Sequence, residues 1–176
     1  MSRLIVVCGE PGVGKSKVAD LLSRRTGGHV LRTDEIRKDL FGPEPEYTSE
    51  ESQQVYDEMF DRAKNLLRDD HKCVILDATF MLKVGRERAD FLAQKYTDPY
   101  NFDIVRVTAD EDVVRKRIRE RENDASDADF SIYQSIRDRF EPIEFPHVEI
   151  DNSGYWWDTM EQCRSKDLYS TPSYYQ

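Results

Sequence analysis

The residues with the clearest chemistry form a glycine-rich loop, residues 9–16, which reads G-E-P-G-V-G-K-S and directly follows the apolar run 4–8. This spacing is typical of a loop whose backbone N–H groups surround phosphates, with Lys15 reaching the β- and γ-phosphates and Ser16 offering its hydroxyl to Mg²⁺. We call residues 9–16 the phosphate loop; the alternative is an ordinary glycine-rich turn. The expected nucleotide-binding residues in and beside it are Gly9, Glu10, Pro11, Gly12, Val13, Gly14, Lys15, Ser16 and Lys17.

A second group of polar residues follows the predicted strand 29–31 and contains Asp34 and Arg37. In open α/β folds, ligands bind at the carboxyl ends of the strands, so Asp34 is expected to face the same cleft as the phosphate loop. A carboxylate there could accept the proton of a hydroxyl group, and Arg37, one helical turn later, could hold an anionic or polyhydroxylated compound. The alternative is that Asp34 only caps the N-terminus of a helix over residues 35–40.

Asp77 closes the apolar run 73–76, as the acidic residue of a Walker B strand does, and is a candidate to order Mg²⁺ or its water ligands. The alternative is an aspartate that bonds only to backbone groups. Further along, Arg86 and Arg88 lie near the start of a predicted helix, where cations oppose the helix dipole. This conflict indicates a ligand for Arg86, although a solvated arginine would also explain it.

Basic residues are concentrated in residues 115–121, where Arg117 and Arg121 are four apart and therefore project from one helical face. We interpret residues 111–130 as a lid whose arginines stabilise phosphate charge and exclude water, against the alternative of a solvated charged helix. Asn152 and Ser153 follow the run 147–150 and are well placed beside a nucleotide base. Their composition is equally typical of a turn.

The elements that would position these residues alternate along the chain. Short apolar runs are expected to form strands at 4–8, 29–31, 73–76, 102–107 and 147–150. Helical patterns separate them, including one starting at the capping box of Thr48 and others over 111–122, 130–140 and 155–163. Strands separated by helices predict an α/β fold, with a doubly wound five-stranded parallel sheet and helices on both faces. In the last helix, Trp156 is interpreted as core covering rather than a base-stacking platform.

The composition predicts one domain, because 176 residues and 20.7 kDa correspond to a single domain of common size. We expect this domain to span residues 1–169, followed by a flexible tail over 170–176. The formal net charge of −9 opposes general attraction to nucleic acid. The three cysteines form no C-x-x-C pair and no apolar run is long enough for a membrane span, so we expect a cytoplasmic protein.

Together these segments resemble the P-loop kinases. The resemblance rests on the phosphate loop, Asp34-x-x-Arg37, Asp77-Ala78-Thr79 followed by arginines, the arginine-rich lid, and Asp151-Asn152-Ser153. The nearest branches are the phage polynucleotide 5'-kinase domain and a predicted-kinase family often fused to aminoglycoside-phosphotransferase-like domains. The segment from Asn123 to Pro142 is especially similar to the second branch.

The resemblance implies a P-loop NTPase fold, ATP as donor and Mg²⁺ as cofactor. It implies Asp34 as general base, with Lys15, Arg117 and Arg121 acting on the transferring phosphate. The acceptor would be bound by Arg37, Thr79 and Arg86, and the metal by Ser16 and Asp77.

We therefore expect an ATP-dependent kinase with a hydroxyl acceptor. That acceptor could be a polynucleotide 5'-hydroxyl end, or a small molecule such as a nucleoside, nucleotide or sugar. A switch that binds ATP with little phosphotransfer is a further alternative. The acidic segment 44–58 argues against a long polynucleotide.

Overall fold

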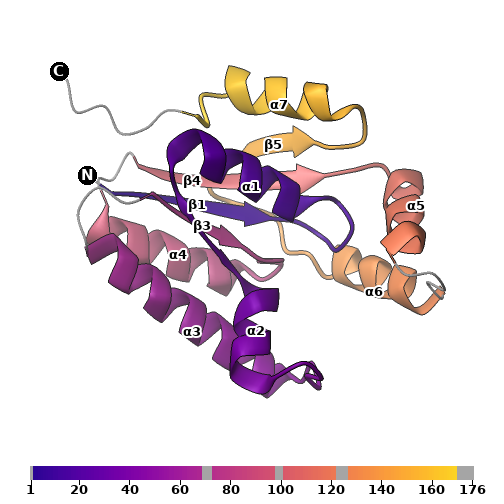
Figure 1. The fold of residues 1–176 in the computed structure, drawn as a ribbon, viewed down its shortest axis with the longest axis horizontal. Coiled ribbons are helices and arrows are strands. Elements are labelled where there is room, and N and C mark those ends of the chain that lie inside the picture. The colour runs from indigo at the N-terminus through magenta and orange to yellow at the C-terminus, as the bar shows by residue number, and fades with distance from the viewer. Residues whose placement is uncertain (1, 69–72, 98–100, 122–126, 170–176) are drawn as a thin grey trace.

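The sheet has five strands, all parallel, in the order β2-β3-β1-β4-β5 (Figure 1). The computed structural model describes residues 2–68, 73–97, 101–121 and 127–169, without the side chains of 121 and 127–129. The strands are β1 (Arg3–Cys8), β2 (His29–Arg32), β3 (Cys73–Asp77), β4 (Phe102–Thr108) and β5 (Val148–Asp151). The predicted doubly wound parallel sheet is confirmed, and each predicted strand agrees with the observed one to within one residue at either end.

Helices cover both faces of the sheet. The helices α1 (Lys15–Thr26) and α7 (Trp156–Ser165) lie on one face, and α3 (Ser49–Arg68) and α4 (Lys83–Tyr96) lie on the other (Figure 1). Because side chains alternate along a strand, Ile5 and Val7 of β1 enter the core beneath α1, whereas Leu4 and Val6 enter the core beneath α3 and α4. The central strand is therefore buried on both sides, as its uninterrupted apolar sequence predicts.

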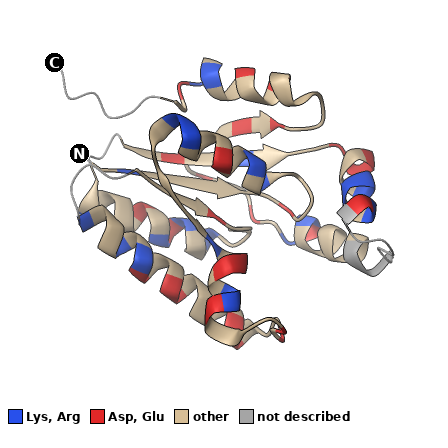
Figure 2. Ribbon diagram, viewed as in Figure 1, with Lys and Arg blue, Asp and Glu red and all other residues tan. Residues whose placement is uncertain are grey.

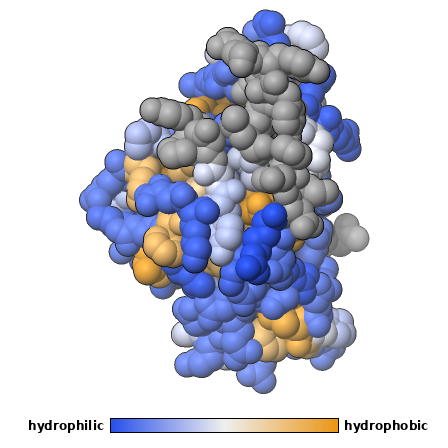
Figure 3. Space-filling model, turned by 90° about the vertical axis from the view of Figure 1, so that its left-hand side faces the viewer, coloured by the Kyte–Doolittle hydropathy of each residue, from blue (hydrophilic) through white to orange (hydrophobic). Residues whose placement is uncertain are grey.

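The remaining helices gather at the carboxyl ends of the strands. They are α2 (Thr33–Phe41), α5 (Glu111–Arg121) and α6 (Asp127–Asp138). Figure 2 shows several basic residues on α5, while acidic and basic residues are interspersed over α3. The opposite end of the molecule, at the amino ends of the strands, has separate apolar patches among mostly hydrophilic side chains (Figure 3). The charged helices thus surround the end of the sheet that carries the phosphate loop.

The start of α3 confirms half of the predicted capping box. The Thr48 hydroxyl accepts the backbone N–H of Glu51 at 3.1 Å, as an N-cap threonine should. The Glu51 carboxylate, however, accepts the N–H groups of Tyr47 and Glu46, at 2.8 and 3.2 Å. It therefore holds the preceding loop against the helix instead of returning to the cap residue.

The other differences from the sequence predictions concern helix boundaries. The helix α2 begins at Thr33 with Arg32 at the N-cap, so the alternative role of Asp34 as N-cap is wrong. This happens because β2 passes directly into α2, and Asp34 lies in the first turn. Part of the predicted lid, residues 122–126, and the predicted tail, 170–176, lie outside the described residues. In the part of the chain that is described, no helix is long and apolar enough to cross a membrane.

Candidate active site

The phosphate loop joins β1 to α1, and its glycines are required by its shape. Gly14 is the N-cap of α1 with φ 95°, a left-handed conformation that side chains disfavour. A Cβ atom on Gly14 would also overlap the side-chain amide of Asn152, and one on Gly9 would lie 2.5 Å from the carbonyl of Val107. The loop therefore packs too closely against β4 and Asn152 for a side chain at these two positions. Its glycine-rich sequence between β1 and α1 is that of a loop whose backbone N–H groups surround phosphate.

Lys15 lies half-buried at the base of this cradle. Its ammonium donates to the carbonyl of Glu10 at 3.0 Å. Burial lowers the pKa of Lys15 below its ordinary value of 10.5, and the charges of Asp77 and Asp34 partly oppose this shift. The same lysine thus lies within electrostatic reach of the carboxylates that end β3 and begin α2.

Asp77 is buried at the end of β3, where only 4 % of its surface is exposed. Its carboxylate accepts from Nε of Arg32 at 3.0 Å. The Arg32 guanidinium also pairs with Asp20 of α1 and, at 3.1 Å, with Glu35 of α2. Burial alone would lower the pKa of Arg32, but its hydrogen bonds to these three carboxylates raise it. Arg32 therefore connects α1, α2 and the carboxylate at the end of β3.

Sequence reasoning missed Arg32. One signal was available in the sequence. Arg32 is a basic residue at the carboxyl end of a predicted strand, and ligands of parallel sheets bind at that end. The partner could not be read from the sequence, because Arg32 faces Asp77 only through the parallel register of β2 with β3.

Asp34 and Arg37 lie on α2 in very different surroundings. Asp34 is exposed. Arg37 is buried, with 8 % exposed, and its two terminal nitrogens lie 3.5 Å from the Glu51 carboxylate and 3.3 Å from the Ser52 hydroxyl. The Tyr47 ring covers its guanidinium at 4.9 Å, and its Nε has no partner among the described residues. Arg37 is therefore held by long contacts that leave donor capacity for a ligand.

Thr79 follows Asp77 in a loop that supports the phosphate loop. Its carbonyl accepts the N–H of Gly9 at 3.2 Å, and its side chain is half-buried. The structure thus places Thr79 beside the phosphate loop. Its predicted contact with the acceptor stays a prediction.

Arg86 requires a correction, because its side chain is fully buried. One terminal nitrogen donates to the carbonyls of Phe80 and Met81 at 2.6 and 3.1 Å. The other donates to those of Glu141 and Pro142 at 3.0 and 2.8 Å. Burial lowers its pKa. With both terminal nitrogens occupied inside the protein, Arg86 cannot reach an acceptor; it instead ties the loop after β3 to the segment after α6.

The lid lies against the phosphate loop through Arg117. Its guanidinium donates to the carbonyl of Val13 at 3.2 Å and to that of Asn152 at 2.6 Å. The Asn152 amide donates to the same Val13 carbonyl at 2.8 Å and accepts from the Thr159 hydroxyl at 2.9 Å. The structure therefore brings Arg117 and Asn152 to the phosphate loop. Their predicted contacts with the transferring phosphate and the nucleotide base stay predictions. Arg121 ends α5, and its side chain lies outside the described part of the chain.

Two further residues of the predicted nucleotide site have other partners. The buried Glu10 carboxylate pairs with Arg106 of β4, so only its backbone faces Lys15. The Ser153 hydroxyl accepts the N–H of Asp110 at 2.7 Å and donates to Asp151 at 2.6 Å. These bonds are those of a turn, which was the alternative to a nucleotide-binding role for Ser153. Ser16 and Lys17, in contrast, are exposed in the first turn of α1.

A parallel sheet with a glycine-rich phosphate loop between β1 and α1 defines the chain as a P-loop protein. Residues 4–143 match the family described as an AAA domain, and the chain belongs to this family. Among curated proteins, none matches the sequence.

Several solved structures share the fold. An APS kinase from Mycobacterium tuberculosis, in complex with AMPPNP and APS, matches with a TM-score of 0.71 and 19% identity over 95% of this chain and 96% of that chain. A sugar kinase from Janibacter sp. HTCC2649 gives 0.70 and 18% over 96% of each chain. A gluconokinase from Sinorhizobium meliloti 1021 gives 0.66 and 18% over 96% of this chain and 95% of that chain. The resemblance to P-loop kinases is thus confirmed for the fold, while the two nearer branches named from the sequence stay predictions.

Proposed function

We propose that this chain is an ATP-dependent kinase that transfers the γ-phosphate to a hydroxyl group of a small molecule. The observation that carries the proposal is the phosphate loop between β1 and α1, in which Lys15 donates to the Glu10 carbonyl at 3.0 Å, with the buried Asp77 at the end of the neighbouring strand β3. A phosphate held by Lys15 would lie between this buried carboxylate, suited to the metal side, and the exposed carboxylate of Asp34, suited to the acceptor side. The kinases of known structure that share the fold support this assignment.

The donor half would be formed by the phosphate loop and its neighbours. The backbone N–H groups of residues 9–16 would surround the phosphates of ATP, with Lys15 at the β- and γ-phosphates. Ser16 and Asp77 would hold Mg²⁺, which neutralises phosphate charge when it is bound. Arg117 is already bonded to Val13 and Asn152, so its positive charge would lie beside the nucleotide. Lys17 and the turn of Asn152 and Ser153 would border the donor.

The acceptor half would use Asp34 as the base. The acceptor oxygen forms a bond to the γ-phosphorus, the bond from that phosphorus to the bridging oxygen breaks, and ADP leaves with that oxygen. The hydroxyl proton passes to the Asp34 carboxylate, which is exposed and therefore accessible. Arg117, and Arg121 from the same helical face, would stabilise the charge on the transferring group.

The surroundings of Arg37 favour a small acceptor over a polynucleotide. Arg37 lies buried beneath the Tyr47 ring, and the exposed residues Glu44, Glu46 and Glu50 border this region. A compact hydroxyl compound carrying one polar or anionic group could meet Arg37 there, with Thr79 nearby. Each additional phosphate of a long strand would meet acidic side chains on a protein of net charge −9.

The test is transfer from γ-labelled ATP and Mg²⁺ to a panel of sugars, sugar acids, nucleosides, nucleotides and 5'-hydroxyl oligonucleotides. We expect labelled product from a small hydroxyl compound. Asp34→Asn should lower kcat by about a hundredfold or more while leaving the Kd for ATP within about twofold. The matched control is Asp39→Asn on the same helix, because Asp39 pairs with Arg62 at the surface.

Three results would contradict the proposal. Full activity of Asp34→Asn would remove Asp34 as the base. Transfer to oligonucleotides in preference to every small compound would overturn the acceptor class. Hydrolysis of ATP that is unchanged by all acceptors would favour the switch described above.

A further inference from the structure

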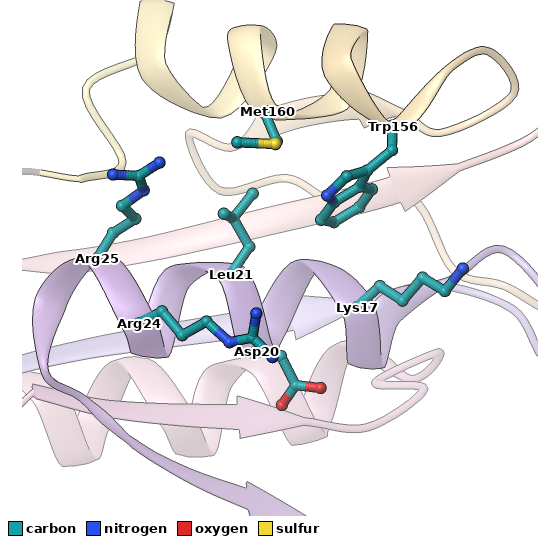
Figure 4. Close-up of a pocket in the computed structure, with 7 residues that line it drawn as sticks. All are labelled: Lys17, Asp20, Leu21, Arg24, Arg25, Trp156 and Met160. Carbon is teal, nitrogen blue, oxygen red and sulfur yellow. The ribbon is translucent and has the colours of Figure 1, made fainter.

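A groove of about 560 Å³ runs between α1 and α7, on the face of the sheet that these helices cover (Figure 4). Its apolar lining consists of Leu21 from α1 and of Trp156 and Met160 from α7. The volume lies within the range of sites that bind small molecules. The groove runs along α1 away from the phosphate loop, and the two meet only at Lys17, which lines one end of the groove.

The charge of this groove is opposite to that of the whole molecule. Its basic lining residues are Lys17, Arg24 and Arg25, and its one acidic lining residue, Asp20, is paired with Arg32. Arg24 and Lys17 form no ion pair with any described residue, while Arg25 lies 5.3 Å from the centre of the Tyr169 ring. In a protein of net charge −9, this local excess of cations selects an anionic ligand.

The groove also has an aromatic wall. Figure 4 shows the indole of Trp156 directed from α7 toward α1, at the Lys17 end, with Arg25 at the other end. Trp156 is 39% exposed and does not belong to the core cluster on this face of the sheet, so its ring remains open to a ligand. The interpretation of Trp156 as core covering is therefore wrong, whereas Met160 and Cys163 of the same helix do pack in or against the core. An open indole next to cations is suited to an aromatic group that carries phosphate.

We propose that this groove is a second binding site, for a nucleoside phosphate, distinct from the phosphate loop. The base would stack on Trp156 and the phosphates would reach Arg24 and Arg25. Lys17 and Arg24 are seven residues apart on α1, about 10 Å along the helix axis, which is the scale of one nucleotide. Because the cationic stretch spans about the length of one nucleotide, the occupant is a small molecule.

The experiment measures binding of ADP and of pyrophosphate to the full chain by isothermal titration calorimetry, in a Lys15→Ala background that disables the donor site. Circular dichroism verifies that each variant is folded. We expect one remaining site that binds ADP more tightly than pyrophosphate, because only ADP offers a base to Trp156. The wild-type chain should bind one more equivalent of ADP than the Lys15→Ala variant.

Matched variants separate the two contacts. Arg24→Gln should weaken ADP binding about tenfold, whereas Arg68→Gln, which removes a similar exposed cation at the end of α3, should not. Trp156→Leu should weaken ADP binding about fivefold or more without changing pyrophosphate binding. The control is Trp157→Leu, because Trp157 is 71% exposed and does not line the groove.

The proposal is overturned if the Lys15→Ala protein binds no ADP at millimolar concentration, or if the Arg24 and Arg68 variants lose affinity equally. Pyrophosphate binding as tightly as ADP would reduce the groove to a general anion site. A short single-stranded oligonucleotide that binds more tightly than ADP would overturn the small-molecule occupant. None of these outcomes depends on phosphotransfer, so the result is independent of the proposed kinase activity.

Discussion

At the scale of single residues, the burial of the charged Lys15 side chain opposes folding. Its pKa is lowered by burial, so the folded protein binds this proton less tightly than the unfolded chain does. Stability then rises with pH between the lowered pKa and the ordinary value, and the full cost is present below the lowered pKa. A phosphate that supplies negative charge would offset this cost.

This argument predicts the behaviour of Lys15→Met, which removes the charge but keeps the apolar stem. We expect the Tm of the unliganded variant to be no lower than that of the wild type, because the lost hydrogen bond to Glu10 is balanced by removal of the buried charge. MgATP should raise the Tm of the wild type and leave that of the variant unchanged. Thermal unfolding with and without MgATP measures both effects, with Lys95→Met as the surface control. A variant that is still stabilised by MgATP would show that Lys15 does not bind the phosphates.

Arg86 illustrates the opposite case, a charge kept for structure. Arg86→Lys keeps the charge but loses the planar group that reaches four carbonyls in two segments. We expect a loss of about 2–4 kcal/mol in the free energy of unfolding, measured by urea denaturation. Arg88→Lys, two residues away, should cost less than about 1 kcal/mol, because Arg88 is 39% exposed and pairs with Asp57 at the surface. Equal losses for the two variants would contradict the structural role of Arg86.

At the scale of elements, the strands and the phosphate loop were predictable because their signals are local. The run 4–8 is apolar throughout and is followed at once by the glycines of the loop, so strand, turn and helix can be read in order. The bonds of Arg32 and Arg86 were not predictable. Arg32 meets Asp77 only through the pairing of β2 with β3, and Arg86 meets carbonyls 55 and 56 residues away in the sequence. Such partners depend on packing between elements, which no local pattern contains.

The phosphate loop as an element depends on Gly14, and its replacement separates two physical effects. Both Gly14 and Gly27 have left-handed backbones, with φ 95° and 70°, so alanine at either position should cost about 1–2 kcal/mol. Only at Gly14 would the new Cβ atom overlap Asn152, whereas the space beside Gly27 is open. Gly14→Ala should therefore also weaken MgATP binding about tenfold or more, and Gly27→Ala should leave it unchanged. Calorimetric titration of both variants measures the difference; equal affinities would mean that Asn152 moves aside without consequence.

At the scale of the whole molecule, the central strands connect two cores that lie on opposite faces of the sheet. One core packs beneath α3 and α4 and includes Ile104 of β4, and the other packs beneath α1 and includes Ile5 of β1. Both tryptophans belong to α7, on the α1 side. Tryptophan fluorescence therefore reports directly on one face only, whereas circular dichroism reports on helices of both faces.

Because β1 contributes side chains to both cores, we expect the molecule to unfold as one cooperative unit. Ile104→Val removes a buried methylene from the core beneath α3 and α4, and should lower the free energy of unfolding by about 0.5–1.5 kcal/mol. The urea midpoint should fall equally by tryptophan fluorescence and by circular dichroism, although both tryptophans lie on the other face. Ile5→Val, in the core on the tryptophan side, is the matched control. It should also lower the fluorescence and circular dichroism midpoints equally. If Ile104→Val shifted the circular dichroism midpoint and left the fluorescence midpoint unchanged, the two faces would be separate folding units and β1 would not couple them.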